Sequence, residues 1–151
     1  MQLRRQDYAN SAARRRRHGG AIIEAALVLP IIFAVSFGAI EFGYFVFMKQ
    51  AVQGAAREGA RAAILQTATT AKVNTAVTSA MAAAGLDDSG YQVQITNGST
   101  GATVNPATAT AQTPIKVVVL CPWSNVSVGL RPLNLIKVSQ NVIGTTVMMK
   151  E

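Results

Sequence analysis

The chain has 151 residues, half of them hydrophobic, and a formal net charge of +7. One cysteine excludes an internal disulfide, and a single cysteine with a single histidine excludes the His/Cys clusters that hold zinc, so we expect no cofactor. Cys121 lies in an apolar run and is expected to be a buried structural thiol. The charge is concentrated in residues 1–19, which carry six arginines against Asp7, a net charge of +5. No aromatic-interleaved basic surface accompanies this arm, and we therefore expect no nucleic-acid partner.

A helix long enough to cross a membrane is predicted after the arginines. The run from Ala25 to Met48 has 24 residues, and Glu41 is its only charged one. As a helix it measures about 36 Å, against about 30 Å for a hydrocarbon core. Lys and Arg remain on the cytoplasmic side of such a span. We therefore expect residues 1–19 to be a basic cytoplasmic leader, residues 20–48 to be the transmembrane helix, and the rest to be exported.

The helix is expected to extend beyond the membrane over residues 49–66, which contain no proline and many good helix formers. Small residues recur at every fourth position along one side, where they let another backbone approach closely. The alternative is an alanine-rich helix without a partner. On the opposite side, Glu58 and Arg61 have i,i+3 spacing and are expected to pair. The small-residue stripe consists of Ala51, Ala55, Gly59 and Ala63.

Residues 67–151 are expected to form a small exported domain. Helical spacing of apolar residues predicts a short helix over residues 72–84, which ends before Gly85. β-Branched and alternating patterns predict strands over residues 91–96, 115–120 and 135–149, the last of which Gly144 could interrupt. The predicted fold class is α+β: a long N-terminal helix, transmembrane and then protruding, followed by a short helix and a small antiparallel sheet of about three strands. Irregular structure is expected at residues 1–13, 87–90, 97–114 and 122–133.

Glu24 lies about one turn inside the predicted span, where an ionised side chain is costly. A cut between Gly19 and Gly20 would create a charged amine about 6 Å away along the helix axis. If neighbouring subunits pack with a stagger of about one turn, the amine of one meets the carboxylate of the next. The alternative is that Glu24 reaches toward the headgroups. Glu41 is expected to reach outward at the opposite interface, and Pro30 to kink or locally melt the helix.

The sequence contains the segments RRRHGGAIIEAALVLP at 15–30, FGAIEFG at 37–43, AAREGARAA at 55–63 and TTVMMKE at 145–151. These segments resemble the TadE-like proteins, the minor pseudopilins of the tight-adherence (Tad, Flp-type) pilus system. The resemblance implies that a prepilin peptidase removes the basic leader on the cytoplasmic face by cutting after a glycine. We place the cut between Gly19 and Gly20; the alternative is a cut after Gly20, which would make Glu24 the fourth residue. The resemblance also implies contacts with other pilin and pseudopilin subunits through the N-terminal helix, and Glu24 as the fifth residue of the mature chain.

The leading hypothesis is a minor pilin-like subunit, not an enzyme, that helps to assemble or prime a type IV-class pilus used for adhesion. It would lie in the bacterial inner membrane as a single-pass protein and could enter the pilus. The alternative is an uncleaved envelope protein whose exported domain binds a partner. A secreted enzyme, released by signal peptidase before Ala39, is disfavoured because the apolar run is too long and continues beyond that point. Asp87 and Asp88 are read as a solvated turn and not as catalytic carboxylates.

Overall fold

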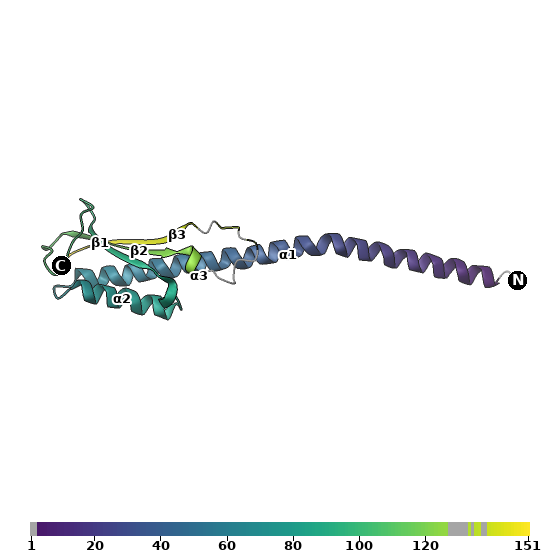
Figure 1. Cartoon of the computed structure of the whole chain (residues 1–151), viewed down its shortest axis with the longest axis horizontal. Helices are drawn as coiled ribbons and strands as arrows, with labels where there is room; N and C mark the ends of the chain where they lie inside the picture. Colours follow the sequence, from purple (N-terminus) through teal and green to yellow (C-terminus); the bar gives the residue numbers. More distant parts are fainter. Residues whose placement is uncertain (1–2, 127–132, 134, 137–138) are drawn as a thin grey trace. The chain divides into compact units, whose positions relative to one another are not determined.

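The computed structural model describes residues 3–126, 133, 135–136 and 139–151 (Figure 1), and it describes side chains from Gly20 onward. The chain divides into two compact units, Met1–Ala39 and Ile40–Glu151. Helix α1 (Leu3–Ile64) provides all the described structure of the first unit and the first element of the second. It differs from expectation in beginning at Leu3, because residues 3–18 contain good helix formers and neither Gly nor Pro. It is also assigned as helix through Pro30, so the predicted melted turn is absent.

The second unit adds a short helix and a sheet to the last part of α1. The sheet is antiparallel with the strand order β1-β2-β3. The α+β class, with a long N-terminal helix, a short helix and three antiparallel strands, is thereby confirmed. The elements after α1 are α2 (Thr70–Ala83), η1 (Asp87–Ser89), β1 (Gln92–Asn97), β2 (Pro114–Pro122), α3 (Trp123–Val126) and β3 (Asn141–Met149).

Local signals explain the bounds of α2. The hydroxyl of Thr69 accepts a hydrogen bond from the backbone N–H of Lys72 at 3.2 Å, and so caps the first turn. Gly85 follows the last turn with φ of +68°, a left-handed conformation that glycine adopts without strain. Between these ends, Val73, Val77 and Met81 are buried, as their spacing predicted.

The core lies between one face of the sheet and the two helices. In β2, alternate residues are buried, from Ile115 to Cys121, as a strand covered on one face requires. In Figure 1, α2 runs beside the C-terminal part of α1. The core forms two clusters that both draw on α1, α2 and β2. The buried α1 side chains are those of Met48, Val52, Ala55, Ala56, Ala60 and Ala63.

The last strand differs from expectation at two points. β3 begins at Asn141 and not at residue 135, and it is not interrupted at Gly144, which pairs with Val119 of β2. Glycine is required there because α1 comes very close. A Cβ atom at Gly144 would lie 2.7 Å from the carbonyl carbon of Val52 and 2.9 Å from the Cα of Gln53. The sequence pattern marked an unusual residue, but the cause is helix packing and not a strand break.

The outer edge of β3 carries a second contact with α1. The side-chain amide of Gln53 donates to the backbone oxygen of Thr145 at 2.9 Å and accepts from its N–H at 3.1 Å. It also donates to the hydroxyl of Thr146 at 3.2 Å. α3 is a further departure, because one helical turn replaces the first part of the connection expected after Pro122. Residues 127–132 of that connection, and residues 137–138 of the predicted strand, lie outside the described residues.

Candidate assembly and membrane-anchoring sites

The first candidate site is the exposed apolar surface of α1. Within the described residues, one helix is long and apolar enough to cross a membrane, and its most apolar window is entirely exposed. Exposed large apolar side chains are expected where the surrounding solvent is lipid, which offers the backbone no hydrogen bonds and so favours a helix. The long apolar helix therefore indicates a membrane-anchored, single-pass protein. Its most exposed members include Ile22, Ile23, Leu27, Ile31, Val35 and Ile40.

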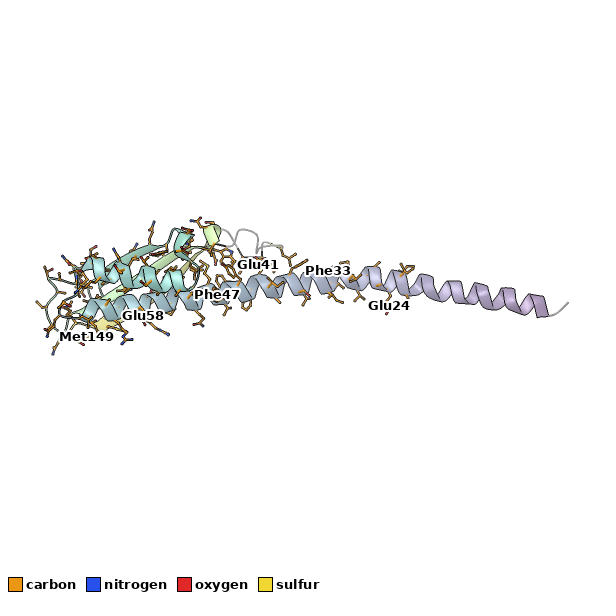
Figure 2. All side chains as sticks on the ribbon, turned by 90° about the horizontal axis from the view of Figure 1, so that it is seen from below. Glu24, Phe33, Glu41, Phe47, Glu58 and Met149 are labelled. Carbon is orange, nitrogen blue, oxygen red and sulfur yellow. The ribbon has the colours of Figure 1, made fainter. Side chains whose placement is uncertain are left out.

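The predicted processing and pairing residues lie on this helix. Gly19 and Gly20 are both helical, and a Cβ atom at Gly20 would meet nothing within 4 Å. Glu24 is exposed (Figure 2), and within the described part of the chain it makes no hydrogen bond or ion pair. A carboxylate on an apolar helix without a partner in its own chain is available for a partner from elsewhere. Its role, like that of the two glycines, stays a prediction.

The small-residue stripe lies inside the second unit. Ala55, Gly59 and Ala63 are buried, and Ala51 is half-buried. A Cβ atom on Gly59 would lie 2.6 Å from a methyl of Val77 in α2 and 3.2 Å from one of Val117 in β2. The close approach that the stripe permits is therefore made by α2 and β2 of the same chain. Its buried members leave no exposed surface for another subunit.

On the opposite side of α1, the predicted ion pair is present but long. The nearest atoms of Arg61 and Glu58 are 4.0 Å apart, and both side chains are mostly exposed. Exposed pairs of this kind contribute little to stability, because water and salt screen them. This side of the helix is a solvated surface.

Glu41 is placed differently from expectation. We expected it to reach outward at the membrane interface, but its side chain is fully buried. Oε1 accepts a hydrogen bond from the backbone N–H of Ile136 at 3.0 Å. Oε2 is also buried and accepts no hydrogen bond from the residues that the structure describes. The expectation was wrong because Ile136, which donates to Glu41, is 95 positions away in sequence, and no local pattern around Glu41 indicates this contact.

Aromatic side chains surround the same turns of α1. The ring of Trp123 in α3 packs edge-on against Phe45, with centroids 5.3 Å apart, and tilted against Tyr44 at 5.9 Å. Such pairs add to the burial of apolar area. A shallow hollow of about 360 Å³ lies beside them, lined by Phe42, Phe45, Leu135, Ile136 and Gln140. Residues 41–48, which we assigned to the span, thus contact elements of the second unit.

The part of α1 that contains most of these residues is similar to a known protein family. Residues 19–61 match a family whose description is TadE-like protein. This part of the chain is TadE-like. The resemblance is confirmed for the motifs within residues 19–61, whereas the TTVMMKE segment at 145–151 lies outside the match. The comparisons with curated proteins and with solved structures found no match.

The TadE-like match covers Gly19, Gly20, Glu24, Glu41 and the small-residue stripe up to Gly59. It covers neither α2 nor the sheet. The TadE-like family consists of structural pilus components and is not an enzyme family. Over residues 19–61, the chain is therefore similar to pilin-like proteins associated with Tad pili.

Among the side chains of the second unit that could carry chemistry are a cysteine and two neighbouring aspartates. Cys121 is buried, and burial raises the pKa of its thiol, although a hydrogen bond with Ser89 acts in the opposite direction. A buried thiol of this kind is a poor nucleophile. Asp87 and Asp88 are exposed, as expected for a solvated turn. No group of three or more potential metal ligands is found in the part of the chain that the structure describes.

Proposed function

We propose that this protein is a minor pilin-like (pseudopilin) structural subunit that takes part in assembly or priming of a tight-adherence type IV-class pilus. The observation that carries the proposal is the TadE-like match over residues 19–61. It unites the Gly19-Gly20 pair, Glu24 and the exposed apolar helix in one segment, directly after the arginines. In this proposal the N-terminus is cytoplasmic, because of those arginines, and the unit that contains the sheet is exported.

A prepilin peptidase removes the leader by cutting between Gly19 and Gly20. The mature chain then begins with the charged amine of Gly20, and Glu24 becomes its fifth residue. Glu24 has no partner within its own described chain, so the amine of a neighbouring pilin or pseudopilin can pair with it. The pair neutralises two charges that lipid would otherwise surround, and it fixes the stagger between adjacent helices at about one turn. Function in this mechanism rests on helix packing and not on catalysis.

N-terminal sequencing of the protein recovered from membranes tests the processing step. We expect the chain to begin at Gly20. A Gly19→Val variant should keep its leader, while Gly20→Ala, which retains the glycine before the cut, should be processed. If the protein from cells that make pili still begins at Met1, the leader is not removed. That result would support the alternative function, an uncleaved envelope protein. A chain that begins at Ala39 would indicate secretion.

The Glu24→Ala variant tests the pairing step separately. It should be processed normally, yet reduce the number of pili per cell about tenfold or more. Glu58→Ala is the matched control, because Glu58 is exposed on the same helix and makes only the long contact with Arg61. The control should leave piliation unchanged. Normal piliation by Glu24→Ala would refute the charge pairing without affecting the conclusion on processing.

A further inference from the structure

Near Glu41, polar and apolar side chains are placed opposite to what is usual in water: the carboxyl group is buried and the neighbouring leucine side chains are exposed. Glu41 is fully buried and receives the backbone N–H of Ile136. The neighbouring Leu135 is 64% exposed, and Leu133 is 38% exposed. A segment that faces water normally buries its leucines and exposes a carboxylate. Here the carboxyl group is inside and the leucine side chains are outside.

The same surface continues onto α1. Phe42 is 64% exposed and lines the hollow of about 360 Å³ together with Phe45, Leu135 and Ile136. We name these four residues the collar. All of them belong to the second unit; Phe42 and Phe45 lie on α1 within about one turn of Glu41, and Ile136 donates its N–H to Glu41. The collar is therefore an apolar surface with a shielded carboxylate beneath it.

The position of the collar along the chain identifies what covers it. Phe42 follows directly on the exposed apolar surface of α1, which reaches Ile40. It is 22 residues beyond Gly20, or about 33 Å at the helical rise, against about 30 Å for a hydrocarbon core. This is the depth of the far interface, where aromatic side chains gather in membrane proteins. Lys49 and Gln50, which are exposed, lie about 10 Å further along the helix, in water.

We propose that the collar inserts into the outer interface of the lipid bilayer, so that the exported unit rests in the membrane and does not stand clear of it. Contact with lipid explains both observations, the exposed apolar side chains and the buried carboxyl group. It receives the exposed side chains of Phe42 and Leu135 at no cost in hydration, and it disfavours a bare carboxylate, which the N–H of Ile136 covers. The inference rests on the membrane span and on the orientation given in the proposed function, and it holds whether or not the leader is removed.

The test places a fluorescent probe on the collar of the full-length chain. The natural cysteine is replaced (Cys121→Ala), and the environment-sensitive dye NBD is attached to Leu135→Cys. Thr100→Cys, in an exposed loop of the same unit, is the matched control. The protein is reconstituted into vesicles of phosphatidylethanolamine and phosphatidylglycerol, with or without lipids that carry a nitroxide at carbon 5 of the acyl chain. Fluorescence of buried Trp123 checks that each variant is folded.

We expect nitroxide lipids to quench the probe at residue 135 at least threefold more than the probe at residue 100. Leu133→Cys should behave like Leu135→Cys and provides a second site if the first is perturbed. Equal quenching at residues 135 and 100 would overturn the proposal. Shielding of residue 135 from aqueous iodide that rises with protein density, without quenching by nitroxide lipid, would also overturn it, because a second copy would then cover the collar.

Discussion

The contact between α1 and β3 at Gly144 yields a sharp prediction for Gly144→Ala. The added methyl group would lie 2.7 Å from the carbonyl carbon of Val52 and 2.9 Å from the Cα of Gln53. Both are backbone atoms, so no side-chain rotation relieves the overlap. Contacts between carbon atoms are favourable only from about 3.5 Å, and β3 must therefore move away from α1 by about 0.8 Å.

That displacement has a calculable cost. The three hydrogen bonds from Gln53 to Thr145 and Thr146 measure 2.9, 3.1 and 3.2 Å, and a further 0.8 Å lengthens each beyond hydrogen-bonding range. Their loss, at about 0.5–1.5 kcal/mol each, and the strain of overpacking together predict a destabilisation of about 3 kcal/mol. For a domain of this size, that corresponds to a decrease in Tm of about 10–20 °C.

The assay is thermal unfolding of the full chain in detergent, followed by the fluorescence of Trp123, the single tryptophan. Gly54→Ala is the matched control: it adds the same methyl group next to Gln53, where a Cβ atom meets nothing within 4 Å. Because Gly54 lies within a helix, this control should raise stability by about 0.5–1 kcal/mol. A Tm for Gly144→Ala within about 2 °C of the unmodified protein would refute the claim that glycine is needed for this contact.

Two further predictions concern the buried polar groups. Glu41→Gln retains an oxygen that can accept the N–H of Ile136, whereas Glu41→Ala leaves that N–H unpaired at a cost of about 1–3 kcal/mol; the alanine variant should therefore have the lower Tm, and equal Tm values would contradict the role of this hydrogen bond. Because burial raises the pKa of the Cys121 thiol, maleimide should label the native protein at least a hundredfold more slowly than the unfolded chain at pH 8. The raised pKa also means that this thiol contributes stability below its unfolded pKa of about 8.5 and loses it as pH rises further, so Tm should fall above pH 9 in the protein but less in Cys121→Ala. A fast native reaction with maleimide would show that the thiol is accessible.

Local sequence signals were sufficient for most elements of the fold. Apolar spacing in α2, with Gly85 after it, predicts a helix without knowledge of its neighbours. The β-branched residues from Ile115 to Leu120 likewise predict a strand, although the buried face of β2 is known only from the structure. These predictions succeeded because the composition and spacing of residues within each element are sufficient to indicate its type.

The predictions were wrong where the role of a residue depends on a contact with a distant part of the chain. Gly144 was read as a strand break, but its role is set by Val52, which approaches from α1. Glu41 was expected at the surface, but Ile136 covers it. The small-residue stripe indicated that another element packs closely against α1, but it did not identify that element. In the structure, α2 and β2 pack there. Contacts of this kind depend on tertiary structure, which a periodic pattern does not encode.

The amide of Gln53 has a consequence for how copies of this protein can associate. It occupies both the donor and the acceptor of Thr145, in the middle of the open margin of β3. A strand from another molecule would find those groups already taken, and would have to displace α1 to pair in register. Sideways growth of the sheet from subunit to subunit is thereby discouraged. The Gln53 amide thus acts against polymerisation through β-strand addition at the middle of β3, and favours filaments built from other surfaces.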